Sequence, residues 1–181
     1  MEANEAGELQ EQAEHGAHDT SMRPVAFTMS VLAVLVSIVT VLGHRTHTEA
    51  VLEQAKASDQ WNFYQAKNIR NTDTSNKEDL LSVMQLTDAK KAAEISKGDA
   101  TQQAKWKDDL KEEREKAEAL DAKVEQAEAR ADRFDLGEAL LEIALVTSSI
   151  TLLTRNRAYW LLGLVFGVAG ILSAASVLFL K

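Results

Sequence analysis

The sequence predicts an all-α integral membrane protein with three transmembrane helices and a soluble helical hairpin or coiled coil between the first and second. Three apolar stretches, residues 25–42, 136–154 and 158–180, each contain about 18 to 23 residues. That length lets a helix cross roughly 30 Å of hydrocarbon. The chain between the first two stretches is highly charged and carries a heptad repeat, which no glycine or proline interrupts before Gly137. Such a repeat is typical of packed helical hairpins and coiled coils.

Composition excludes several classes of protein. The chain has no cysteine, so it contains no disulfide framework, thiolate metal site or covalently attached haem. The net charge of −8 comes mostly from the polar segments and disfavours nucleic acid as a partner. We find no spaced nucleophile, glycine-rich phosphate loop or metal-binding motif. We therefore expect no enzymatic activity, no cofactor and no small-molecule substrate.

The chain begins with an acidic tail and a first span. Residues 1–23 contain six acidic residues against one arginine and almost no large apolar side chain, which predicts a disordered or weakly helical tail. Pro24 suits the first turn of a helix, so the first transmembrane helix is expected at 24–43. It is not a cleaved signal peptide, because the region before it is acidic. Small side chains recur along this span and predict a face for close helix approach: Ala26, Ser30, Ala33, Ser37 and Thr40.

Residues 44–135 are expected to form the hairpin. A helix is predicted over 48–70, with Ala50, Gln54, Ala57, Trp61, Tyr64 and Asn68 on one seam. Polar residues at 71–76 predict a turn, and Ser75 with Glu78 forms a capping box for a second helix. Gly98 then fits the end of that helix, and Asp99 fits the N-cap of a return helix.

The return helix carries the clearest pattern in the chain. Its a and d positions are apolar except for Glu113, and they predict the buried seam of the hairpin. Those positions are Trp106, Leu110, Glu113, Ala117, Leu120, Val124, Ala127, Ala131 and Phe134. The large aromatic residues are interpreted as packing anchors rather than as a ligand pocket. These anchors are Trp61, Phe63, Tyr64, Trp106 and Phe134.

The second and third spans, 136–154 and 158–180, are joined by a three-residue connection that predicts a tight helical hairpin. The third span contains two small-xxx-small motifs, which favour close approach of helix backbones. The residues that form them are Gly163, Gly167, Gly170 and Ala174.

Acidic side chains enter the second span. Glu138 and Glu142 lie one helical turn apart, and Glu142 lies roughly 9 Å beyond the start of the span by helix rise. A charge at that depth needs a partner or a proton. Counting inward from the same membrane face predicts a hydroxyl cluster around it, made of Ser37, Thr40, Ser173 and Ser176. Two roles stay open, an ion or proton relay and polar contacts that hold helices together; the absence of a basic partner favours the second.

Two motifs resemble a known family. The segment 61–69 reads W-N-F-Y-Q-A-K-N-I, and 134–144 reads F-D-L-G-E-A-L-L-E-I-A. Both resemble motifs of a bacterial membrane family, domain of unknown function 4337, in which the first follows one span and the second begins another. The resemblance covers the chain from about residue 25 to its end. It implies this architecture and a bacterial origin, and it carries no activity.

The distribution of charge leaves the topology open. Arg155 and Arg157 in the short connection would place the hairpin outside by the positive-inside rule. The basic residues near the hairpin ends of the spans favour a cytoplasmic hairpin, which we take as the prediction. They are Arg45, Lys56, Lys116, Lys123, Arg130 and Arg133.

The expected function is structural. The small-residue faces and the long seam each require a helix partner, which favours a scaffold or accessory subunit of a bacterial inner-membrane assembly. Its expected partners are the lipid bilayer and either further copies of the chain or a larger membrane complex. The alternative is a small homo-oligomeric channel or transporter that uses Glu142 and the nearby hydroxyls.

Overall fold

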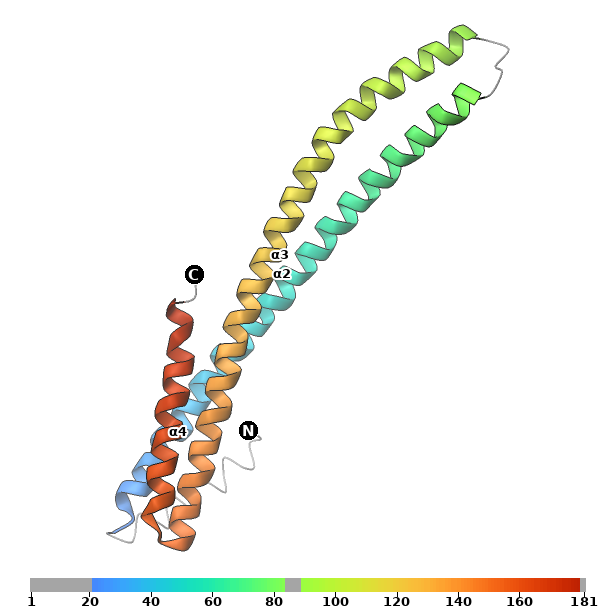
Figure 1. Cartoon of the computed structure of the whole chain (residues 1–181). Coiled ribbons are helices and arrows are strands. Elements are labelled where there is room, and N and C mark those ends of the chain that lie inside the picture. Colours follow the sequence, from blue (N-terminus) through green and yellow to red (C-terminus); the bar gives the residue numbers. More distant parts are fainter. Residues whose placement is uncertain (1–20, 84–88, 180–181) are drawn as a thin grey trace. The chain divides into compact units, whose positions relative to one another are not determined.

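The computed structural model describes residues 21–83 and 89–179, and every element in that part of the chain is helical (Figure 1). Helix α2 runs Arg23–Val83, α3 runs Ala89–Thr154, and α4 runs Arg157–Ser176, followed by a short 3₁₀ helix, η1, at Val177–Phe179. Three of these helices are long and apolar enough to cross a membrane. The prediction of an all-α chain with three such helices is therefore confirmed. The acidic tail lies outside the described residues.

The helices fall into two compact units. The first contains Met1–Ala50 together with Gln126–Lys181, and the second contains Val51–Glu125. Helices α2 and α3 contribute to both, while α4 belongs to the first alone.

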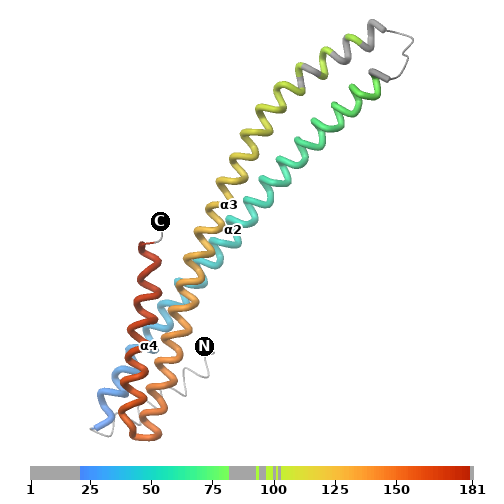
Figure 2. Tube along the Cα trace, in the orientation of Figure 1, coloured from blue at the N-terminus to red at the C-terminus, as the bar shows by residue number. Residues whose placement is uncertain are grey.

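The first unit is a bundle of three helices, traced in Figure 2 by the start of α2, the end of α3 and α4. Its core contains apolar residues of α2 that recur every three or four positions, so they share one face. They pack against Leu141, Ala144 and Leu145 of α3, each at most 1% exposed. The residues that α2 contributes are Val25, Met29, Leu32, Val36 and Val39.

The second unit is an antiparallel pair of helices. Cross-helix hydrogen bonds join Lys77 to Asp99 and Gln60 to Glu113. The residue later in α2 therefore pairs with the residue earlier in α3, as antiparallel helices require. The predicted seam of α3 is buried or half-buried at all nine positions, of which Trp106 to Val124 lie in this unit. The buried heptad seam predicted for the return helix is therefore confirmed.

The register predicted for the other side of the seam is partly wrong. Ala57 and Tyr64 face inward, but Gln54 and Asn68 are exposed. The intervening inward positions are instead occupied by side chains that include Gln60 and Lys67. Helix packing alternates steps of three and four residues. The predicted set and the observed set both alternate in this way and differ only in which step comes first, so the spacing alone could not choose between them.

The predicted turn at 71–76 is also wrong, because α2 continues without a break to Val83. The Thr72 and Thr74 hydroxyls each donate to a backbone carbonyl one turn back, at 3.0 Å. Such bonds satisfy the polar side chains that favour turns while the backbone stays helical. Asn71, Thr74 and Glu78 are half-buried and extend the inward-facing seam past the expected turn.

The expected break at Gly98 and Asp99 is likewise wrong, since both residues lie inside α3. Asp99 does not cap a helix; it accepts a hydrogen bond from Nζ of Lys77 at 2.6 Å. A Cβ added at Gly98 would meet no atom within 4 Å. This glycine is therefore neither a required left-handed residue nor a packing contact.

Candidate functional site

A charged group lies inside the helical pair of the second unit. Glu113 is only 9% exposed, although it occupies a position that the repeat assigns to an apolar residue. Its carboxylate accepts hydrogen bonds from Nε2 of Gln60 at 2.6 Å and from Nζ of Lys67 at 3.0 Å. Lys116 lies farther away, at 3.7 Å. The apparent defect in the apolar seam is thus a paired ion.

The hydrogen bonds from Lys67 and then Gln60 hold the pKa of the Glu113 carboxyl below its ordinary range, against the opposing effect of desolvation. A depressed carboxyl pKa in the folded state adds stability above the unfolded pKa of roughly 4.3, and that stability is lost as pH falls through the folded value.

We therefore expect Glu113→Gln to reduce the stability of the second unit at pH 7, and the difference from the wild type to narrow as pH falls below roughly 4.3. Urea unfolding followed by tryptophan fluorescence over this pH range measures it. A difference that stayed constant down to pH 3 would contradict the assignment, because neutral glutamine cannot reproduce the titration of the ion.

Four of the five predicted aromatic anchors belong to the same helical pair. Trp61 donates its indole N–H to Oδ2 of Asp121 at 2.9 Å and meets Tyr64 edge to face, with ring centroids 5.7 Å apart. Trp106 is half-buried, as is Phe134 in the first unit. Phe63 differs, because it is 51% exposed and its ring is covered by Nζ of Lys67 at 4.7 Å. Four of the five predicted anchors are thus at least half-buried.

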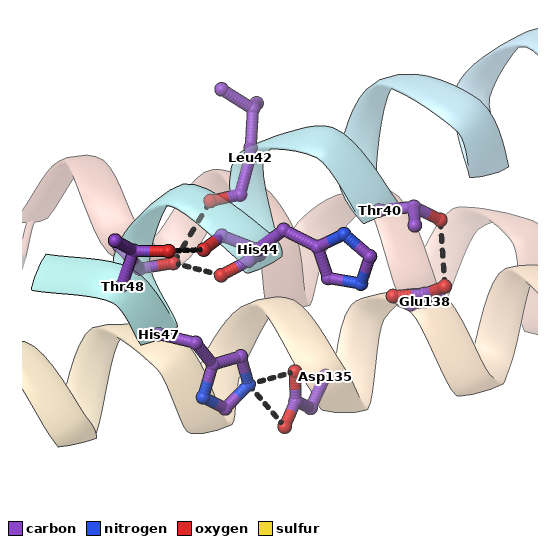
Figure 3. A network of polar contacts seen from close by, with 9 residues as sticks. Thr40, Leu42, His44, His47, Thr48, Asp135 and Glu138 are labelled. Carbon is purple, nitrogen blue, oxygen red and sulfur yellow. Dashed lines mark hydrogen bonds and ion pairs between the residues drawn. The ribbon is translucent and has the colours of Figure 1, made fainter. Parts of the chain in front are cut away.

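In the first unit, Figure 3 shows a polar cluster where residues 40–48 of α2 lie beside residues 135–138 of α3. The hydroxyl of Thr40 donates to Oε1 of Glu138 at 2.6 Å. Farther along α2, Nε2 of His47 lies 2.9 and 3.0 Å from the two carboxylate oxygens of Asp135 in α3. The residues described by the structure contain no group of three or more His, Asp or Glu placed to hold a metal ion.

The structure gives hydrogen bonds for each hydroxyl of the predicted cluster. Thr40 contacts Glu138, one helical turn before Glu142. The serine hydroxyls donate to backbone carbonyls: Ser37 to Ala33, Ser173 to Arg133, and Ser176 to Ser173. Glu142 itself is half-buried. The pair of His47 and Asp135 was not predicted, and its signal in the sequence is only that both residues border predicted spans.

The small residues of α4 form a seam against α3. A Cβ at Gly163 would lie 2.7 Å from Oγ of Ser148, and one at Gly170 would lie 2.9 Å from the carbonyl oxygen of Gly137. A Cβ added at Gly137 would in turn lie 3.1 Å from Cβ of Ala174. The close approach that the motifs predict is therefore made inside the chain. A Cβ added at Gly167 would lie 3.1 Å from Cδ2 of Leu32 in α2.

This arrangement is that of an all-helical chain with three helices suited to crossing a membrane and a separate antiparallel helical unit. The chain belongs to the family described as Domain of unknown function (DUF4337), whose model matches residues 21–180. The resemblance found in the sequence motifs is thus confirmed. No curated protein and no solved structure matches the chain.

Proposed function

We propose that this protein is a membrane-anchored scaffold or accessory subunit of a bacterial inner-membrane assembly. The three apolar helices anchor it in the bilayer, and the helical pair at 51–125 forms a soluble arm on the cytoplasmic side. The arm binds a protein partner through helix contacts. The glycine seam of α4 is occupied by α3, so the proposal rests on the outer face of the arm rather than on that seam.

The observation that carries the proposal is a difference between the outer faces of the two helices. In the arm, α2 exposes Leu52, Ile69 and Leu80 at 55%, 60% and 63%. In the described stretch 103–125 of α3, no large apolar residue is exposed, and the outward positions are mainly charged. Large apolar side chains that are exposed on only one helix of the pair support a protein-binding side on that helix. The outer face of α2 is therefore the side on which a partner binds.

The test is affinity purification of the full chain in mild detergent, followed by native mass determination. We expect an unrelated subunit in fixed ratio with the wild type. Leu52→Glu with Ile69→Glu should reduce its recovery at least about tenfold, since each introduces a charge into an apolar contact. The matched control is Ala119→Glu with Ala122→Glu, on exposed positions of α3, which should leave recovery unchanged.

A preparation that contains only copies of this chain would contradict the accessory role and favour the alternative, a homo-oligomeric channel or transporter. Conductance in a planar bilayer would then be measured for the wild type and for Glu142→Gln. Conductance that survives this substitution would exclude a relay through Glu142.

A further inference from the structure

An apolar groove runs along the first unit between α2 and α4. One part of it, about 190 Å³ in volume, is lined by residues of α2 from Phe27 to Leu35 and residues of α4 from Leu164 to Ile171. A second part of about 270 Å³ adjoins the first and shares Leu35 and Ile171 with it. Phe27 is 72% exposed and Val168 is 56% exposed, so the groove opens sideways from the bundle.

Two arginines lie at one end of this groove. Helix α2 begins at Arg23 and α4 begins at Arg157, and both residues are exposed. By helix rise, Arg23 precedes Phe27 by roughly 6 Å and Arg157 precedes Leu164 by roughly 10 Å. The Trp160 indole N–H donates to the hydroxyl of Thr28 at 3.3 Å. This hydrogen bond joins α4 to α2 near the arginine end of the groove.

These distances match the layers of a bilayer. A headgroup layer is roughly 5–7 Å thick on each side of the hydrocarbon. Arginine side chains reach from the end of a span into that layer, and tryptophan is enriched at the boundary. Along the groove, the arginines come first, the indole next and the apolar lining last. A phospholipid in a bilayer has the matching order of phosphate, interfacial region and acyl chain.

We infer that this groove binds an anionic phospholipid, with one acyl chain in the groove and the phosphate beside Arg23 and Arg157. The inference rests on the proposed insertion of the three helices in a membrane. Charge decides between a lipid and a second copy of the chain. A second copy in the same orientation would bring its own arginines to the same depth, where like charges repel, whereas a phosphate is attracted.

The test is native mass spectrometry of the full chain transferred from nanodiscs with equal amounts of phosphatidylglycerol and phosphatidylcholine. We expect the wild type to retain phosphatidylglycerol about tenfold more than phosphatidylcholine. Arg23→Gln with Arg157→Gln should bring the ratio close to one. The matched control is Arg45→Gln with Arg133→Gln, exposed residues toward the other end of the bundle, which should keep the preference.

A second variant tests the groove itself. Val168→Trp places a large ring in the open side and should reduce retention of both lipids several-fold, although both arginines remain. Equal retention of the two lipids by the wild type, or an unchanged preference after removal of the two arginines, would overturn the phosphate site. Unchanged retention by Val168→Trp would overturn the acyl-chain site.

Failure of the underlying proposal has a different signature. If the helices did not insert, alkaline carbonate would release the protein from membranes before any lipid measurement. Protein that resists this extraction yet shows no lipid preference would contradict the lipid site alone.

Discussion

Gly170→Val is expected to weaken the contact between α4 and α3 and to destabilise the first unit by about 1–3 kcal/mol, the usual range for overpacking. Even a Cβ at this position would lie 2.9 Å from both the carbonyl oxygen of Gly137 and Cγ of Leu141, and 3.1 Å from the backbone nitrogen of Leu141. Two of these three atoms are backbone, so a rotamer change cannot relieve the clash. The larger valine therefore forces the helices apart. Loss of helical circular dichroism in mixed micelles of increasing sodium dodecyl sulfate measures the effect.

Gly98→Ala is the matched control, because an added Cβ there meets nothing within 4 Å. Alanine is favoured over glycine in a helix interior by about 0.5–1 kcal/mol, so this variant should be as stable as the wild type or more so. If Gly170→Val proved as stable as Gly98→Ala, α4 would not pack on α3 as described.

The sequence predicts the main helical pattern because that pattern depends on periodicity. Three apolar stretches and one heptad repeat were sufficient to predict three membrane-length helical segments and the buried seam of α3. The motif at Gly163 and Gly167 predicts close approach of another helix, but a stripe of small residues does not identify which helix packs against it. Only the three-dimensional arrangement assigns the stripe to α3 and α2 rather than to a second chain.

The errors occur where local preference and packing disagree. The polar residues at 71–76 and Gly98 resemble helix ends, yet the helices continue through both segments. Tertiary contacts along a continuous seam override such local signals. Gln60 and Lys67 were missed for a related reason, since a polar residue at a core position looks like an outward one until its partner is known. For Lys67 that partner is Glu113, 46 positions along the chain.

Lys67→Met is expected to have a comparably large effect in the second unit. It leaves the Glu113 carboxylate, whose side chain is 12% exposed, without its nearest cation at 3.0 Å. A buried polar group that loses its partner costs about 1–3 kcal/mol, and a charged one costs more. Deuterium exchange of peptides covering residues 105–120 should therefore speed up by roughly one order of magnitude at pH 7.

The double variant Lys67→Met with Glu113→Leu decides whether the ion pair stabilises the helical pair or serves another purpose. Replacing a buried pair with apolar residues is often neutral or stabilising, so exchange should return to the wild-type rate or below it. Exchange as fast as in Lys67→Met alone would show that the unpaired Glu113 carboxylate is not what destabilises the single variant. If the double variant is instead stable, the pair is retained for a reason other than stability. The alignment of two helices by one buried polar contact is the best attested such reason, because an ion pair has one matching position and an apolar seam has several.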